Sequence, residues 1–504
     1  MAADGHDAEG QAAASGGVGL AAEIRRLGSQ TLIYGIGGVA LQLVGIITLP
    51  VFARVFSPAD FGIIELATVI LAILMIVVDG GMASASQRSY FDHGDEEEAQ
   101  RRRILVTALL FQLALGAVVA TALTVFADPL SRALFEGRDV SGLLMILGAM
   151  LPAFALAQFT REILRLEFRA WSYLASSVAG AIVGATVSIL AVVAWDAGVE
   201  GPFIGLFAGT AVSALYGLAL VWRRLVARPS RRELDIMLRF GVHLIPTALA
   251  LWSLSLIDRV MLAQLADLEE LGQYAIATRV ALPVLMLVMA LALAFSPFAL
   301  SLFQSDPERE KDVRARILTD FTAGLVLVGL VSALWAREIA ELVAPDFDES
   351  FRAVGLVAFG LVGFGISSVV VAGISFTRQT KWLTLYTGAA TLLNIALNVV
   401  LIPPLGMIGT ALATLVAYGL LAGLYYRRAQ ILYPTPYRGA AVLGTFAAGL
   451  ALMPLGAIAY DSWLLGTVVK LAAIVAFLLA LRALAVVPTL RPGVALAWVR
   501  GALR

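Results

Sequence analysis

The sequence contains no cysteine and only three histidines among its 504 residues. Without cysteine there is no disulfide and no thiolate metal site, and His6, His93 and His243 lack the spacing of a metal site. Charged residues make up 14% of the chain, whereas soluble domains carry about 25%. The 36 basic and 36 acidic residues cancel, so charge gives no reason to expect a nucleic-acid partner.

Enzyme signatures are also missing from the sequence. It has no Walker A pattern, no G-x-S-x-G and no H-E-x-x-H. No stretch between its apolar runs is long enough for a soluble catalytic domain. We therefore expect neither an enzyme nor a transporter driven by ATP bound to this chain, and we expect no cofactor.

Hydrophobic residues are what the chain has in excess, at 60% of the total with a mean hydropathy of +0.89. A helix needs about 20 mostly apolar residues to span a bilayer. Runs of that length lie near 30–53, 59–83, 104–127, 140–160, 172–195, 203–222, 241–265, 272–301, 317–336, 353–376, 383–402, 408–426, 439–459 and 463–486. The sequence therefore predicts an all-α integral membrane protein with about 14 transmembrane helices, the long eighth run kinked at Pro283 or Pro297.

Basic residues give the expected orientation, because short cytoplasmic loops accumulate Lys and Arg. Most of the 36 basic residues fall in alternate connections, as in Arg101–Arg103, Arg223–Arg239 and Arg427–Arg428. This pattern predicts that both termini lie in the cytoplasm.

Landmarks recur along the chain at nearly one spacing. Gly62 matches Gly272 at a shift of 210 residues, and Ile204–Gly205 matches Ile408–Gly409 at a shift of 204. We expect two six-helix lobes related by a pseudo-twofold axis along the membrane normal. The expected parts are a disordered cytoplasmic tail (1–28), an N-terminal lobe (29–224), a cytoplasmic linker (225–240), a C-terminal lobe (241–428), and two further helices with a cytoplasmic tail (429–504).

Charged residues inside the expected spans include Glu65, Asp258, Arg259 and Arg279, each in the outer half of its span. A charge in hydrocarbon costs about 2.5–3.5 kcal/mol, so such residues usually face a cavity. All four lie roughly 10–12 Å below the outer surface and come from both lobes, so they can meet across a cavity. The alternative is a set of structural ion pairs that fasten the helices.

The pattern of the other polar residues in or near the expected spans indicates a functional site less clearly. A second charged set lies at the inner side: Asp79, Arg88, Arg161, Glu162 and Arg165. Ordinary basic helix ends would produce the same pattern. Asn394 and Asn398, one turn apart, either pack helices together or line a cavity. Lys470, in the last span, can snorkel outward.

Two stretches carry a family resemblance. Residues 391–428 read TLLNIALNVVLIPPLGMIGTALATLVAYGLLAGLYYRR, two apolar segments joined by a Pro-Gly hairpin and closed by paired arginines. Residues 245–274 read IPTALALWSLSLIDRVMLAQLADLEELGQY, with an Asp-Arg pair inside a span and an acidic hairpin after it. The chain resembles the Wzx-type polysaccharide flippases, whose superfamily also holds multidrug exporters and lipid II flippases.

The resemblance implies a flippase for polyprenyl-pyrophosphate-linked oligosaccharide in the bacterial inner membrane. It would act by ion-coupled alternating access in O-antigen, lipopolysaccharide or exopolysaccharide synthesis, with other polysaccharide assembly proteins as possible partners. The expected substrate-binding residues are Arg259, Arg279, Arg161, Arg165 and Arg88. The expected proton or sodium sites are Glu65, Asp258 and Asp79.

Three alternatives stay open. A multidrug or cation antiporter of the same superfamily would favour carboxylates over arginines in its cavity, so Arg259 and Arg279 argue mildly against it. A lipid II flippase has the same expected architecture. A membrane scaffold would use the buried charges only to fasten helices.

Overall fold

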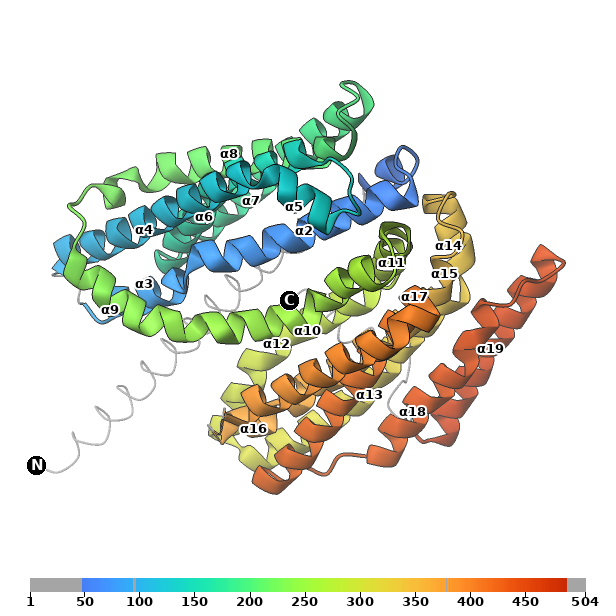
Figure 1. Cartoon of the computed structure of the whole chain (residues 1–504). Helices are drawn as coiled ribbons and strands as arrows, with labels where there is room; N and C mark the ends of the chain where they lie inside the picture. The colour runs from blue at the N-terminus through green and yellow to red at the C-terminus, as the bar shows by residue number, and fades with distance from the viewer. Residues whose placement is uncertain (1–47, 94–96, 378, 380, 487–504) are drawn as a thin grey trace, which may run out of the picture.

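The computed structural model describes residues 48–93, 97–377, 379 and 381–486. Within these ranges the chain forms helices and connections, and no β-strand. The expected tail 1–28 and most of the expected first span, 30–53, lie outside the described residues. Figure 1 shows two bundles of long helices, which we call the first and the second bundle.

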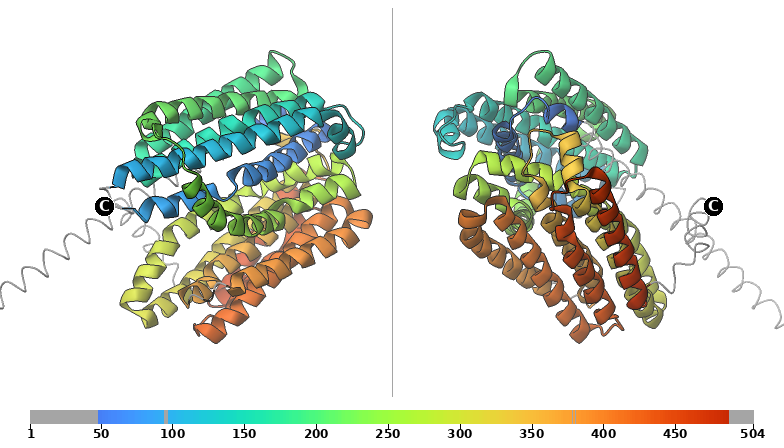
Figure 2. Two further views of the ribbon diagram at one scale, coloured as in Figure 1. Left: turned by 60° about the vertical axis from the view of Figure 1, so that its left-hand side comes forward. Right: turned by 90° about the vertical axis from the view of Figure 1, so that its right-hand side faces the viewer.

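The first bundle follows the order of the chain. Its helices are α2 (Pro58–Asp79), α3 (Met82–Phe91), α4 (Glu98–Val125), α5 (Ala127–Leu134), α6 (Ser141–Leu166), α7 (Ala170–Val193) and α8 (Gly201–Val221), with 3₁₀ turns η2 (Gly198–Glu200) and η3 (Trp222–Leu225). The helix α9 (Arg231–Gly241) and the turn η4 (Val242–Leu244) then lead into the second bundle, as Figure 2 shows.

The second bundle contains more of the described helices than the first. Its helices are α10 (Ile245–Leu265), α11 (Leu268–Val280), α12 (Leu282–Ser305), α13 (Pro307–Leu334), α14 (Ala336–Val343), α15 (Phe351–Val370), α16 (Ala372–Phe376), α17 (Lys381–Leu432), α18 (Gly439–Leu452) and α19 (Trp463–Ala483), with η5 (Met453–Gly456). α17 contains two expected spans, which turn back on each other at Gly406, where φ is 52°. Glycine adopts this left-handed conformation without strain.

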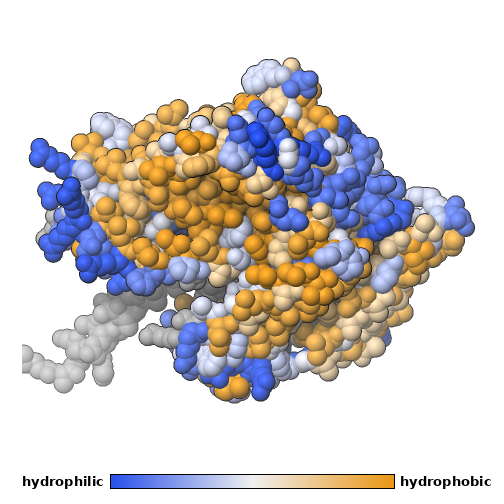
Figure 3. All heavy atoms as spheres, viewed as in Figure 1, coloured by the Kyte–Doolittle hydropathy of each residue, from blue (hydrophilic) through white to orange (hydrophobic). Residues whose placement is uncertain are grey.

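The prediction of an all-α integral membrane protein is confirmed. Among the described residues, ten helices are long and apolar enough to cross a membrane, or eleven if α11 and α12 form one bent span. The expected count of 14 is not confirmed. The bend of 50° between α11 and α12 lies directly before Pro283, one of the two positions at which the sequence predicts a kink. Figure 3 shows an apolar band over the long helices, with polar residues towards both ends.

The helix bounds of the two bundles recur at one spacing. α2 begins at Pro58 and α11 at Leu268, 210 residues later. α4 and α13 are both 28 residues long, and α5 and α14 are both eight residues long. This recurrence supports the interpretation of two copied lobes, which remains our proposal. We call the end of the bundles that carries α5 and α14 the outer end, following the expected orientation.

The two bundles touch closely at the outer end, where α2 lies along α11. A Cβ atom built on Gly62 would lie 1.8 Å from the carbonyl oxygen of Leu268. A Cβ atom on Gly272 would lie 1.8 Å from the carbonyl oxygen of Pro58. Any larger residue at either position would push the helices apart, so we call Gly62 and Gly272 the glycine contact.

Other contacts between the bundles surround the glycine contact. The Leu268 backbone N–H donates to Glu136 Oε1 at 2.8 Å, and Gln264 Nε2 donates to the Leu134 carbonyl oxygen at 3.1 Å. These bonds join the end of α10 and the start of α11 to the segment around the end of α5, so they help to close the outer end.

Lys470 in α19 does not snorkel into solvent, contrary to one sequence expectation. It is 2% exposed and forms an ion pair with Glu338 of α14. The neighbouring carboxylate explains the difference, because it satisfies the ammonium group inside the protein. The pair fastens α19 to α14 within the second bundle.

Candidate functional site

Glu65 is the only charged residue that the structure buries on α2. A capping box fixes the start of this helix: Ser57 Oγ accepts from the Asp60 backbone N–H, and Asp60 accepts from the Ser57 backbone N–H, both at 3.2 Å. Glu65 follows two turns later and is 8% exposed. The cap therefore sets the depth of the carboxylate below the outer end.

The partners of Glu65 come from the second bundle. Arg259 Nε donates to Glu65 Oε1 at 2.7 Å, and Arg279 Nη2 donates to Glu65 Oε2 at 3.1 Å. The side chains of Arg259 and Arg279 are 15% and 31% exposed. One carboxylate of the first bundle thus binds two guanidinium groups of the second, as charge-assisted hydrogen bonds.

Asp258 completes the arrangement from the second bundle. Tyr274 donates its hydroxyl to Asp258 Oδ2 at 2.9 Å, and Arg259 Nη1 lies 3.4 Å from Asp258 Oδ1. Asp258 is 5% exposed and Tyr274 is 2% exposed. We call Glu65, Asp258, Arg259, Tyr274 and Arg279 the gate cluster.

The gate cluster balances its own charge. Its two carboxylates and two guanidinium groups sum to zero, which is the condition under which buried ions are tolerated. Aromatic rings add to the cations' environment: the Arg279 guanidinium lies 5.1 Å from the Phe61 ring centroid and that of Arg259 lies 5.9 Å from the Tyr274 ring centroid. If the bundles separate here, Glu65 leaves with α2. The second bundle then keeps two arginines against one carboxylate.

The sequence places four of these residues at one depth, and the structure brings all four together. Tyr274 is a member that the sequence does not single out as a site residue. A tyrosine five residues before a membrane arginine is the signal that could have found it, since a buried hydroxyl needs a polar partner. The functional roles of these residues remain predictions.

Asp79 lies elsewhere, at the inner end of α2. Its Oδ2 accepts from the Gly81 backbone N–H at 3.1 Å, and its Oδ1 accepts from the Ala83 backbone N–H at 3.3 Å. Gln112 Nε2 also donates to Oδ1, at 2.9 Å. The carboxylate therefore caps the first turn of α3. Fourteen residues of helix, about 21 Å, separate it from Glu65.

The three inner arginines do not form one cluster. Arg88 lies over the Phe240 ring at 4.8 Å, and Arg165 pairs with Glu162 at 2.7 Å. Arg161 Nη1 donates to Ser213 Oγ at 3.0 Å. Arg161 also lines a cavity of about 470 Å³ within the first bundle.

Asn394 and Asn398 are both buried in α17 and bind each other. Asn398 Nδ2 donates to Asn394 Oδ1 at 3.0 Å and to the Asn394 carbonyl oxygen at 3.0 Å. Their exposed fractions are 1% and 0%. The two side chains thus bind along their own helix, which supports the packing interpretation, while Asn398 Oδ1 is buried without a hydrogen-bond partner among the described residues.

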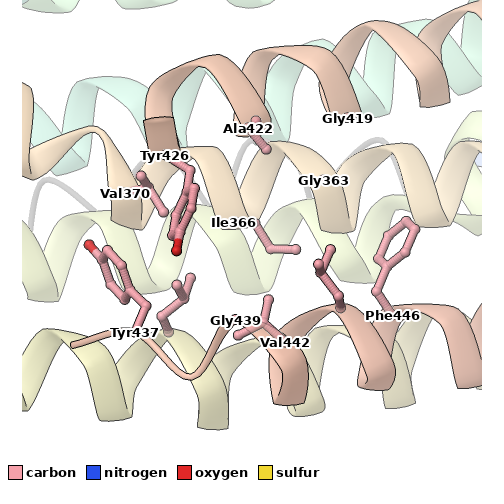
Figure 4. A pocket seen from close by; sticks show the side chains of 13 residues that line it. Gly363, Ile366, Val370, Gly419, Ala422, Tyr426, Tyr437, Gly439, Val442 and Phe446 are labelled. Carbon is pink, nitrogen blue, oxygen red and sulfur yellow. The ribbon is translucent and has the colours of Figure 1, made fainter. Parts of the chain in front are cut away.

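An apolar groove of about 320 Å³ lies between α15, α17 and α18 (Figure 4). Its wall contains small residues, including Gly363, Gly419 and Gly439, and the two tyrosines Tyr426 and Tyr437. Among the described residues no charged side chain lines it, so its chemistry suits a hydrocarbon chain. Scattered glycines on three separate helices give no sequence signal for such a groove.

Two curated proteins are similar to the chain. "Succinoglycan biosynthesis transport protein ExoT" of Rhizobium meliloti (strain 1021) is 24% identical over 324 residues, which are 62% of this chain and 61% of that protein. "Probable low-salt glycan biosynthesis flippase Agl15" of Haloferax volcanii is 23% identical over 414 residues, 79% of this chain and 81% of that protein.

Solved structures share the fold. "Lipid II flippase MurJ, inward closed conformation" superimposes with a TM-score of 0.68 at 16% identity, covering 88% of this chain and 98% of that chain. An inward-facing multidrug resistance MATE family transporter of the MOP superfamily gives a TM-score of 0.64 at 15% identity, covering 77% and 94%. At this identity the likeness concerns the fold alone.

The family follows from a match over more than half of the sequence. Residues 27–303 match the sequence model of the family described as "Polysaccharide biosynthesis protein". This confirms the family resemblance, and the match includes residues 245–274 but ends before residues 391–428. The chain is a multi-pass membrane protein that belongs to the polysaccharide biosynthesis protein family.

Proposed function

We propose that this protein is a flippase for polyprenyl-pyrophosphate-linked oligosaccharide. It works in the inner membrane of a bacterium, with both termini in the cytoplasm. The family, and the glycan transport named for both curated relatives, support a role in moving lipid-linked glycan. The fold shared with flippases and transporters supports alternating access between two lobes.

The bond of Glu65 to both Arg259 and Arg279 is the observation that carries this proposal. This bond joins the two bundles near the outer end. In it the Glu65 carboxylate occupies two arginine side chains that would suit a phosphate group. Arginine forks match phosphate oxygens in two-point hydrogen bonds. A pyrophosphate group can therefore take the place of Glu65 on the second bundle.

The exchange links substrate binding to movement. With Glu65 bound, the outer end is closed by the gate cluster and the glycine contact. When the pyrophosphate occupies Arg259 and Arg279, Glu65 loses its partners and the outer end is free to open. Two arginines that exchange a carboxylate for another anion in this way favour the proposed substrate over a cationic drug.

Ion coupling belongs to the same proposal. A proton or a sodium ion at Glu65 neutralises the carboxylate and weakens its attraction to both arginines. Uptake of the ion from outside then favours the outward-open state. Asp258 stays with the second bundle and offers an additional acceptor.

Substitution of the arginines tests the proposal. Arg259→Ala and Arg279→Ala should each stop export of surface polysaccharide at normal protein level, and Arg→Lys should restore it in part because lysine keeps the charge and loses the fork. Arg138→Ala, at an exposed outer position, is the matched control. Normal export by the double alanine variant would refute the substrate role, and loss of the protein from the membrane would indicate a structural role.

A further inference from the structure

The helix α9, which connects the two bundles, is held on the first bundle by one face. Glu233, Met237 and Gly241 are buried at intervals of four residues, so they share that face. Gln100 Nε2 of α4 donates to Glu233 Oε1 at 2.7 Å. The Ser230 backbone N–H donates to Thr107 Oγ1 at 2.9 Å. α9 is therefore positioned by contacts on α3 and α4.

The exposed surface of α9 and of the residues just before it, from Trp222 onward, is basic. We call Arg223, Arg228, Arg231 and Arg232 the basic face. All four are exposed, and among the residues that the structure describes none of them has a carboxylate partner. By contrast, the nearby Arg239 pairs with Asp235 at 2.9 Å. Four exposed guanidinium groups without a described carboxylate partner form a surface that suits anions from outside the chain.

Apolar side chains lie among these arginines. Trp222, Val226 and Ile236 are 52%, 62% and 46% exposed, respectively. Exposed tryptophan and aliphatic residues beside arginines are typical of segments that lie in the headgroup region of a bilayer. Figure 3 shows polar and apolar atoms meeting at the end of the bundles where α9 lies. A soluble acidic partner would leave these apolar side chains without a matching environment.

We propose that the basic face is a docking surface for anionic phospholipids of the leaflet at the inner end. The arginine forks bind the headgroup phosphates, and Trp222, Val226 and Ile236 enter the interface beside them. Lipid phosphate at this surface is separate from the pyrophosphate of the proposed substrate, because the gate cluster lies at the opposite end of the bundles.

The surface lies next to the point where the bundles are joined. A Cβ atom on Gly81 would lie 2.3 Å from the Gly241 carbonyl oxygen, so the end of α9 packs directly on the break between α2 and α3. Lipids bound to the basic face hold this side of the connection at the membrane surface. The second bundle then moves relative to a first bundle fixed by lipid headgroups.

The test uses the purified full-length protein, with phosphatidylglycerol titrated into it in neutral detergent and bound lipid counted by native mass spectrometry. The triple variant Arg228→Gln, Arg231→Gln and Arg232→Gln should weaken binding on the order of a hundredfold, since each basic residue near an anionic surface contributes about a fivefold gain. The triple variant Arg132→Gln, Arg138→Gln and Arg352→Gln removes the same charge from outer positions and should bind as the native chain does.

Hydrogen exchange in nanodiscs locates the effect. Residues 231–241 should exchange more slowly when phosphatidylglycerol is added to phosphatidylcholine, and raised salt should remove the difference by screening. Equal exchange in both lipid mixtures would overturn the proposal, as would equal loss of binding in the two triple variants. Neither readout depends on flipping or on orientation, so either result stands apart from the proposed function.

Discussion

Replacing Gly62 by alanine should open the outer end of the protein. The added Cβ atom would lie 1.8 Å from the Leu268 carbonyl oxygen, whereas real contacts of this kind are essentially never below 3.0 Å. The helices α2 and α11 must therefore separate by at least about 1.2 Å. Gly272→Ala should do the same from the other side, against the Pro58 carbonyl oxygen.

The cost falls on one state of the transport cycle. Forcing an extra methyl group into a packed contact costs about 1–3 kcal/mol. Once the outer ends have separated, the methyl group meets no backbone and costs little. The ratio of outer-open to outer-closed protein should thus rise by roughly 5- to 150-fold.

Thiol labelling measures this shift, because the native chain has no cysteine. Ala275→Cys places a reporter one turn beyond Gly272, at a position that is fully buried in this structure. An impermeant maleimide should label it faster in the Gly62→Ala and Gly272→Ala backgrounds. Gly324→Ala and Gly388→Ala, where the new methyl group meets no atom of the described residues within 4 Å, are the controls. Equal labelling in all four backgrounds would refute the reasoning.

Three further predictions concern orientation, coupling and stability. A cysteine at Arg228 should resist an impermeant reagent in intact cells, while one at Glu200 should react; the reverse would invert the topology. Glu65→Gln should flip substrate in proteoliposomes without dependence on a proton or sodium gradient, so continued dependence would exclude Glu65 as the coupling group. Glu338→Ala leaves the Lys470 ammonium without its carboxylate, costs about 1–3 kcal/mol and should lower the melting temperature in detergent. Adding Lys470→Met removes the unpaired ammonium and should restore the melting temperature. An unchanged melting temperature in Glu338→Ala would show that the pair contributes nothing to stability.

The long helices and the depth of the charged residues follow from the sequence by simple rules. Hydropathy locates the spans, and a rise of 1.5 Å per residue places Glu65 and Arg259 at one depth. The sequence does not say that one carboxylate binds both arginines. Which groups Glu65 binds depends on how α2 is rotated about its axis relative to α10 and α11. Tertiary packing sets that rotation.

Other features depend on contacts between distant parts of the chain. α5 and α14 are eight residues each and lie almost entirely between the expected spans, where a search for apolar runs of about 20 residues predicts no helix. Lys470 meets Glu338 across 132 residues. No local rule identifies such a partner. The sequence alone therefore suggests that the Lys470 ammonium is an isolated charge.

The glycine contact lies on the same faces of α2 and α11 as Glu65 and Arg279 of the gate cluster. Gly62 and Glu65 are three residues apart on α2, and Gly272 and Arg279 are seven apart on α11, so each pair shares a face. The close backbone approach therefore sets the reach of the carboxylate to the guanidinium groups. A separation of little more than 1 Å would carry bonds of 2.7 and 3.1 Å beyond hydrogen-bonding distance for at least one arginine. Closing the outer end and neutralising the arginines are then a single event, and an anion that occupies them must also overcome the packing of the two glycines.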